Sequence, residues 1–289
     1  MEVTVAKTAG FCFGVERAVR MVREEADRGT FPLYTYGPII HNETVVEDLA
    51  RRGVRILNEE RLREIEAAHA GSGLPQGTVI LRSHGVSRSE EERMRRAGLR
   101  VLDATCPFVK KIHRIAEETG KEGRRLIICG DKNHPEVRGI VGWSTGPADV
   151  LGSADELGPQ AGAGPATVVA QTTLQQKNFQ EMVEKLRTAI YDIRVVNTIC
   201  NATQMRQSEA AELSLRSDTI LVIGGADSSN SRKLYEICRN RCGRTYFIRT
   251  LEDLVKQGIR PTGSVGITAG ASTPKNIIEE VQTYVRSEF

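Results

Sequence analysis

The sequence has 289 residues and lacks any apolar run that approaches the roughly 20 residues a membrane-spanning helix needs. It also lacks the pattern of a secretory leader, because residues 1–5 lead directly into a predicted strand. We therefore expect a cytoplasmic protein that does not associate with membranes. In that compartment, the six cysteines are expected to serve metal binding or catalysis more often than a disulfide framework.

The sequence has little excess charge of either sign. Forty basic and 37 acidic residues are interspersed along the chain and give a net charge of +3. No basic stripe or patch interleaved with aromatic residues indicates a nucleic-acid partner. Neither GxxxxGK[ST] nor GxGxxG occurs, so the common nucleotide-binding loops are excluded. At 39% hydrophobic and 27% charged residues, the composition is that of an ordinary globular protein.

Three of the cysteines stand at equal intervals. Cys12, Cys106 and Cys200 are each separated from the next by 94 positions. Each follows a short run that is typical of a buried strand, and these runs are VTVAKTAGFC, LRVLDATC and IRVVNTIC. Three consecutive units that place one thiol at the same point can bring the three thiols to a common centre. The spacing therefore predicts a metal site on a pseudo-threefold axis.

The repeat extends beyond the cysteines. Apolar residues at helical spacing follow Cys12 and Cys106, whereas the pattern after Cys200 is weaker. Each unit then contains two further strand-like runs that are followed by a polar residue. Because carboxyl ends of parallel strands form the ligand-binding edge of an α/β sheet, we expect these residues at a binding site. The six residues are His41, His84, His134, Thr172, Ser228 and Ser272.

This repetition sets the expected domain organisation. A prior of about 150 residues per domain suggests two domains, but internal repeats take precedence and predict three. The predicted fold class is α/β, with three small pseudo-threefold-related lobes around the central metal site. The lobes are expected at residues 13–106, 107–199 and 200–289, with the N-terminal strand, residues 1–12, completing the third lobe.

Several of the polar residues are predicted at helix starts, where unpaired N–H groups and the helix dipole favour an anion such as phosphate. Ser87 and Glu90 resemble a capping box, and Thr172 and Ser272 are also predicted to cap helices. The SSNS run at 228–231 offers several neutral hydrogen-bonding groups to one anion. By contrast, Cys129, Cys238, Cys242 and His113 are predicted to be structural residues.

Nine motifs in order resemble those of the LytB-type 4-hydroxy-3-methylbut-2-enyl diphosphate reductase family, which catalyses the last step of the methylerythritol phosphate route to isoprenoids. The resemblance covers residues 10–274, essentially the whole chain. The motifs are GFCFGVERAV, IIHNE, RSHGVS, DATCPFV, HPEVRG, QTTL, TICNATQMRQ, SSNS and TAGASTP.

The resemblance implies a 4Fe-4S cluster held by Cys12, Cys106 and Cys200, with the fourth iron open to substrate. It implies reduction of an allylic alcohol diphosphate to isopentenyl and dimethylallyl diphosphate with loss of water, and Glu136 as the proton donor. It also implies a substrate site. The implied substrate-binding residues are His41, His84, His134, Thr172, Ser228, Ser229, Asn230 and Ser272. Because the electrons arrive one at a time, we expect an external donor such as ferredoxin or flavodoxin and no bound nicotinamide.

Three other functions remain open at the level of the sequence. A zinc site with three cysteine ligands and an open fourth position is typical of a hydrolase or hydratase. An aconitase-like dehydratase also uses a three-cysteine cluster, but without net electron transfer. A non-catalytic iron-sulfur sensor would need a partner surface that the near-neutral charge pattern does not indicate. Metal analysis and the requirement for a reductant distinguish these classes.

Overall fold

The computed structural model describes residues 2–156 and 164–289, and these form two compact units. The first unit comprises the chain up to Val15, the segment His41–Val45 and Cys200–Phe289. The second comprises Glu16–Ile40 and Val46–Ile199.

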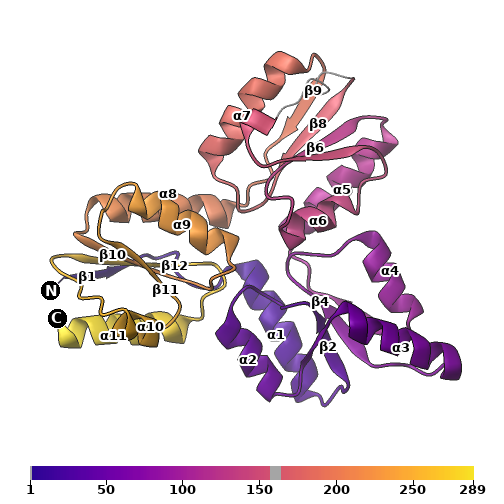
Figure 1. Ribbon diagram of the computed structural model, residues 1–289, viewed down its shortest axis with the longest axis horizontal. Helices are drawn as coiled ribbons and strands as arrows, with labels where there is room; N and C mark the ends of the chain where they lie inside the picture. Colours follow the sequence, from indigo (N-terminus) through magenta and orange to yellow (C-terminus); the bar gives the residue numbers. More distant parts are fainter. Residues whose placement is uncertain (1, 157–163) are drawn as a thin grey trace. The chain divides into compact units, whose positions relative to one another are not determined.

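The first unit contains a parallel sheet of four strands in the order β1-β12-β10-β11 (Figure 1). Strand β1 pairs with β12, with Val3 opposite Val265, although the two strands lie at opposite ends of the chain. The prediction that the N-terminal strand joins the C-terminal lobe is therefore confirmed. The strands of this sheet are β1 (Val3–Val5), β10 (Thr219–Ile223), β11 (Thr245–Ile248) and β12 (Val265–Ala269).

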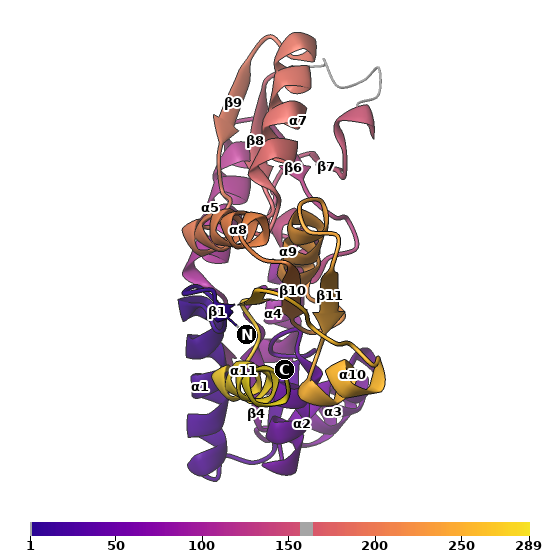
Figure 2. The same ribbon diagram turned by 90° about the vertical axis from the view of Figure 1, so that its left-hand side faces the viewer.

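Helices cover both faces of this sheet (Figures 1 and 2). Apolar residues of α8 and α9 pack on one face with Ile220 and Val222, and those of α10 and α11 pack on the other with Leu221 and Ile223. This alternation follows from the two-residue period of a strand. The helices are α8 (Asn201–Leu215), α9 (Ser229–Arg239), α10 (Leu251–Lys256) and α11 (Lys275–Glu288).

The second unit contains two parallel sheets, in the orders β3-β2-β4-β5 and β7-β6-β8-β9. In all three sheets of the described chain, the strand that precedes a predicted ligand cysteine is an edge strand at the same place in the order. The repeat in the sequence is thus a repeat of topology. The strands are β2 (Leu33–Tyr36), β3 (Arg55–Leu57), β4 (Thr78–Leu81), β5 (Arg100–Asp103), β6 (Arg125–Cys129), β7 (Ala148–Leu151), β8 (Ala166–Ala170) and β9 (Ile193–Val196).

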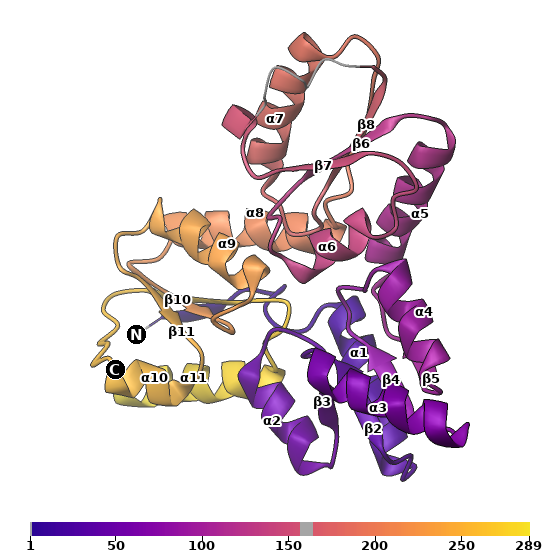
Figure 3. The same ribbon diagram turned by 45° about the vertical axis from the view of Figure 1, so that its right-hand side comes forward.

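Helices also cover both faces of these two sheets (Figures 1 and 3). In the first, α1 and α2 lie on one side and α3 and α4 on the other. In the second, α5 and α6 pack on one face and α7 on the other. The helices are α1 (Phe13–Asp27), α2 (Glu43–Arg51), α3 (Glu59–Ser72), α4 (Arg88–Arg96), α5 (Pro107–Lys121), α6 (Pro135–Val141) and α7 (Gln176–Ala189), with a short 3-10 helix at Ala154–Glu156.

The predicted fold class, three small α/β lobes, is confirmed by these three sheets. The lobe boundaries at 13–106, 107–199 and 200–289 stay a prediction, and residues 157–163 of the predicted second lobe lie outside the described residues. No helix of residues 2–156 and 164–289 is long and apolar enough to span a membrane.

Candidate active site

The three equally spaced cysteines stand at equivalent places in the fold. Cys12 directly precedes α1, and Cys106 and Cys200 directly precede α5 and α8 as their N-cap residues. All three are partly exposed thiols. Cysteines that bind metal are typically partly exposed, whereas buried structural cysteines are inert. The positions therefore suit metal ligands.

The other three cysteines are different in kind. Cys129, Cys238 and Cys242 are buried among the apolar residues of two separate cores. Burial raises the pKa of the Cys129 thiol to about 12, so it stays protonated at neutral pH. The structural role predicted for these residues agrees with their burial.

In the first unit, a group of hydroxyls gathers at the carboxyl ends of β10 and β12. Ser228 caps α9, and its side chain lies 2.9 Å from the hydroxyl of Ser231 and 3.5 Å from that of Ser272. Ser272 also donates a hydrogen bond to the main-chain carbonyl of His41 at 3.0 Å. The structure therefore brings the two predicted polar positions of this sheet together, and adds Ser231.

Asn230 is the clearest sign that this group of hydroxyls is built for a ligand. Its side chain is 5% exposed, yet within the described part of the chain neither its amide oxygen nor its amide nitrogen has a hydrogen-bond partner. A buried amide without partners is costly, so a polar ligand is expected to complete it. Ser229 precedes it at the first position of α9 and is partly exposed.

In the second unit, Glu136 in the first turn of α6 forms a buried pair with Thr172, which lies just beyond β8. The Thr172 amide donates to one carboxyl oxygen of Glu136 at 2.7 Å, and the Thr172 hydroxyl donates to the other at 2.6 Å. Burial raises the pKa of Glu136, and the two hydrogen bonds from Thr172 oppose this shift only in part. The carboxyl group is thereby favoured in its protonated form, as a proton donor requires.

Two of the predicted histidines lie beside this pair. The rings of His84 and His134 meet edge to face with their centroids 5.4 Å apart. His134 caps α6, and its Nδ1 accepts a hydrogen bond from the Glu136 amide at 3.2 Å. The second unit therefore brings His84 and His134 together, with His134 bound to the main-chain amide of Glu136.

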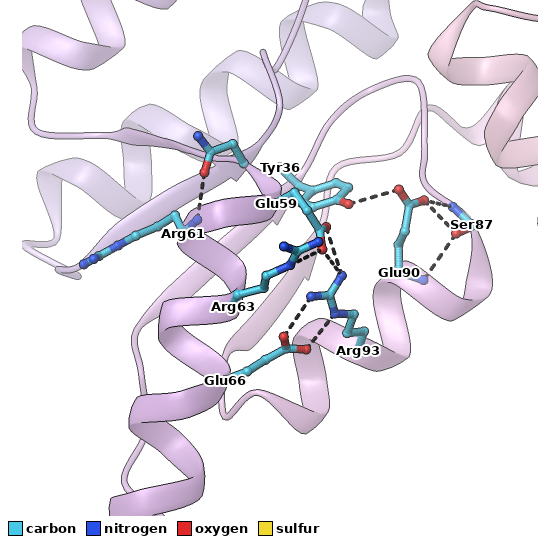
Figure 4. A network of polar contacts seen from close by, with 9 residues as sticks. Tyr36, Glu59, Arg61, Arg63, Glu66, Ser87, Glu90 and Arg93 are labelled. Atoms are coloured by element: carbon cyan, nitrogen blue, oxygen red, sulfur yellow. Dashed lines mark hydrogen bonds and ion pairs between the residues drawn. The ribbon is translucent and has the colours of Figure 1, made fainter.

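A polar network holds the loop that carries His84 (Figure 4). Ser87 and Glu90 form the predicted capping box of α4. The same Glu90 carboxylate accepts a hydrogen bond from the Tyr36 hydroxyl at 3.0 Å, which links the loop to β2. Burial, together with the negative charge of Glu90, raises the pKa of Tyr36, so the phenol remains a donor. Further along α4, Arg93 binds Glu59 and Glu66 of α3.

A second contact fixes this loop against α6. The indole of Trp143, just beyond α6, donates a hydrogen bond to the Val86 carbonyl at 2.8 Å and stacks on the His113 ring at 5.2 Å. The His113 ring also lies against Gly85, where an added Cβ would stand 2.7 Å from its Cε1 atom. Gly85 has φ +74°, which favours glycine there. His113 is thus a packing residue, as predicted, between the elements that carry His84 and Glu136.

This packing makes the stability of the second unit depend on pH. Burial lowers the pKa of His113 to about 4, Asp103 opposes this shift and Lys110 adds to it. As the pH falls from 6.5 to 4, the unfolded chain binds a proton at this histidine and the folded chain does not. The free energy of unfolding therefore decreases by about 3 kcal/mol across this pH range.

Replacing His113 by phenylalanine keeps an aromatic ring on Trp143 and removes the titrating group. The difference in unfolding free energy between wild type and variant is expected to change between about pH 7 and pH 4.5 in favour of the variant. Urea unfolding followed by fluorescence measures it, because Trp143 is the only tryptophan of the chain. An unchanged difference would show that His113 does not titrate as described.

Two predicted helix caps are wrong. Helix α7 is capped by Gln175 rather than Thr172, and α11 is capped by Pro274 rather than Ser272. In each case the predicted residue lies earlier in the turn and makes another contact, Thr172 with Glu136 and Ser272 with His41. The capping role predicted for Ser87 is confirmed.

Sequence reasoning missed Arg206, a buried residue of the first unit, and included Ser231 only as a member of the SSNS run. Ser231 lies within the SSNS run, and the sequence alone does not separate it from its neighbours. Arg206 lies in α8, where the apolar pattern is weak because the buried face includes Thr203, Arg206 and Gln207. A run of polar residues where the repeat predicts a buried helix face is the signal that could have found it.

The fold and these groups define a class of α/β protein with three parallel sheets. In each sheet, one edge strand is followed along the chain by a partly exposed cysteine, and polar residues lie beyond the carboxyl ends of other strands. The sequence model of the LytB protein family matches residues 3–286. The chain belongs to this family.

Named relatives agree with the match. The chain is 42% identical over 288 residues, 99% of its length and 97% of the relative's, to 4-hydroxy-3-methylbut-2-enyl diphosphate reductase of Caldanaerobacter subterraneus. Among solved structures, it is similar to (E)-4-hydroxy-3-methyl-but-2-enyl diphosphate reductase, described as the terminal enzyme of the non-mevalonate pathway. That structure has a TM-score of 0.71 and 38% identity over 99% of both chains. The corresponding reductase of Plasmodium falciparum has a TM-score of 0.86 and 28% identity over 99% of this chain and 87% of that one.

Proposed function

We propose that this protein reduces 4-hydroxy-3-methylbut-2-enyl diphosphate to isopentenyl diphosphate and dimethylallyl diphosphate, the last step of the methylerythritol phosphate pathway. The family match and the full-length relatives with this name support the activity. The observation in the structure that supports it most directly is the buried Glu136 carboxyl group, whose pKa is raised by burial and whose two oxygens are held by Thr172.

The LytB family is a family of iron-sulfur enzymes, and the thiols of this chain fit such a cofactor. Cys12, Cys106 and Cys200 are partly exposed thiols at helix starts, whereas the remaining cysteines are buried in cores. We infer that these three residues hold one 4Fe-4S cluster and leave one iron without a protein ligand. When bound, such a cluster supplies electrons one at a time and a Lewis-acidic iron.

The diphosphate is proposed to bind at the hydroxyls of the first unit. Ser228, Ser229 and Ser272 offer hydroxyl donors, and the unpartnered amide of Asn230 offers both a donor and an acceptor. Ser228 also stands at the N-terminus of α9, where main-chain N–H groups and the helix dipole favour an anion. His41, His84, His134 and Thr172 are proposed to complete the substrate site.

Glu136 is proposed to supply protons. Conversion of the alcohol to the hydrocarbon consumes two electrons and two protons: one proton leaves with the hydroxyl group as water, and the other enters the carbon skeleton. A carboxyl group with a raised pKa is a suitable general acid. The two hydrogen bonds from Thr172 hold it in one orientation, and the capped start of α6 positions it next to His134.

The electrons are proposed to come from an external carrier such as a reduced ferredoxin or flavodoxin, and the protein is proposed to work in the cytoplasm. Turnover by anaerobically reconstituted protein tests the function. Both products are expected from the allylic diphosphate only when a reductant is present, with two electrons consumed per product. Product formed equally well without reductant would indicate an aconitase-like dehydratase, and a colourless protein with zinc and no acid-labile sulfide would indicate a zinc hydrolase with three cysteine ligands.

A further inference from the structure

Within the described residues, Arg206 is a buried cation without an anionic partner. Its side chain is 3% exposed, and no carboxylate lies within ion-pair distance of it in that part of the chain. An arginine stays protonated in proteins, and burying its charge is costly unless an anion compensates it. Burial lowers the pKa of Arg206, while Cys12 and Cys200, followed by Glu209, oppose that shift.

Main-chain carbonyls bind the guanidinium. Its Nε and Nη2 donate to the Thr8 carbonyl at 2.9 and 2.6 Å, and Nη2 also donates to the Gly10 carbonyl at 2.8 Å. Both carbonyls belong to the segment that leads into Cys12. One turn later on α8, Glu209 accepts hydrogen bonds from the amides of Lys7 and Thr8. Helix α8, which begins after Cys200, therefore holds the segment before Cys12 in place.

The surroundings of Arg206 indicate which anion balances its positive charge. The guanidinium binds the Gly10 carbonyl, two residues before Cys12, and Cys200 immediately precedes the helix that carries Arg206. A cluster held by thiolates carries net negative charge. The proposed cluster would therefore supply the negative charge that Arg206 lacks nearby.

We propose that Arg206 is a positioning residue that holds the segment before Cys12 and provides the buried positive charge that balances an anionic cluster. This inference rests on the proposed function, because it assumes that Cys12 and Cys200 bind the cluster. A fixed cation beside a cluster favours its reduced, more negative state, and so raises its reduction potential. It also stabilises the thiolates against loss of iron.

The chain supplies a comparison. Arg17 of α1 donates to the carbonyls of Asp103 and Thr105 at 3.1 and 3.2 Å, in the segment that leads into Cys106. The contact is of the same type, but Arg17 is only partly buried, so solvent screens its charge. Arg17→Gln is therefore expected to change the reduction potential less than Arg206→Gln does.

The test compares Arg206→Gln with Arg206→Lys in reconstituted, anaerobic protein. Glutamine keeps a hydrogen-bond donor but removes the positive charge. Lysine keeps the positive charge but lacks the planar set of N–H donors of the guanidinium. The reduction potential, followed by EPR-monitored titration, is expected to become more negative in Arg206→Gln and to stay near wild type in Arg206→Lys. Iron loss to a chelator is expected to be several-fold faster in Arg206→Gln. Arg241→Gln, an exposed site in the same unit, controls for net charge and is expected to match wild type.

Equal potentials in wild type and Arg206→Gln would overturn the inference, as would equal shifts in the lysine and glutamine variants, which would indicate scaffolding without a charge effect. If Arg206→Gln does not fold, a wild-type potential in Arg206→Lys supports the inference and a shifted one contradicts it. Wild-type protein that takes up no iron and sulfide would instead refute the proposed function itself.

Discussion

Replacing Glu136 by glutamine is expected to lower kcat by about 10²–10⁴-fold, the usual contribution of a general acid. The amide has nearly the same shape, and its oxygen still accepts a hydrogen bond from Thr172. The change therefore removes the transferable proton with little effect on packing. Because the substrate is proposed to be bound mainly by other groups, KM is expected to change much less than kcat.

A matched exposed change separates this effect from a general loss of acidic charge. Glu118→Gln on α5 alters an exposed carboxylate of the same unit and is expected to retain wild-type kcat. Iron and sulfide content should be unchanged in both variants. Near-normal turnover by Glu136→Gln would show that Glu136 is not the proton donor. Its raised pKa would then be a consequence of burial without a catalytic role.

Replacing Cys200 by serine is expected to abolish turnover and to leave the reconstituted protein with little iron or acid-labile sulfide. The serine side chain has the same shape as cysteine, but its hydroxyl is a harder and much poorer ligand for the iron of a cluster than a thiolate is. The expected loss is close to complete, because two protein ligands hold a cluster far less firmly than three. Absorbance, iron and sulfide analysis measure the outcome.

Cys238→Ser is the matched control for this variant. Cys238 is buried in the same unit, and its thiol lies 3.7 Å from the Ala210 carbonyl, a contact that a serine hydroxyl can also make. This variant is expected to bind iron and sulfide in wild-type amounts. If Cys238→Ser loses the cluster as completely as Cys200→Ser does, the assignment of the equally spaced cysteines as ligands would be wrong.

The repeat makes the fold predictable. The interval between Cys12, Cys106 and Cys200 reflects three sheets of one topology, and it correctly places β1 beside β12. That pairing joins the two ends of the chain, which local propensity cannot reveal. The repeated pattern of strands and cysteines is visible in the sequence because each unit buries equivalent strands and has a cysteine after an equivalent edge strand.

The caps are less predictable, because a hydroxyl near a helix start has several possible partners. The spacing of Thr172 and Ser272 is typical of caps, but their hydroxyls bind Glu136 and the His41 carbonyl, which lie far away in sequence. Long-range partners therefore decide the outcome.

Helix α8 shows a related limit of sequence patterns. The first half of its buried face consists of the polar residues Thr203, Arg206 and Gln207, so the apolar period that marks a buried helix is weak there. The polar residues of this face include Arg206, whose guanidinium binds the main-chain carbonyls of Thr8 and Gly10. Sequence patterns thus fail where the structure departs from ordinary core packing, at the candidate site.

Mössbauer spectroscopy of the anaerobically reconstituted protein, recorded with and without 4-hydroxy-3-methylbut-2-enyl diphosphate, tests the central claim most directly. The account predicts four irons per chain, one of which has distinct parameters that change when the diphosphate is added. Four irons that do not respond to the diphosphate, or zinc in place of iron and sulfide, would contradict it.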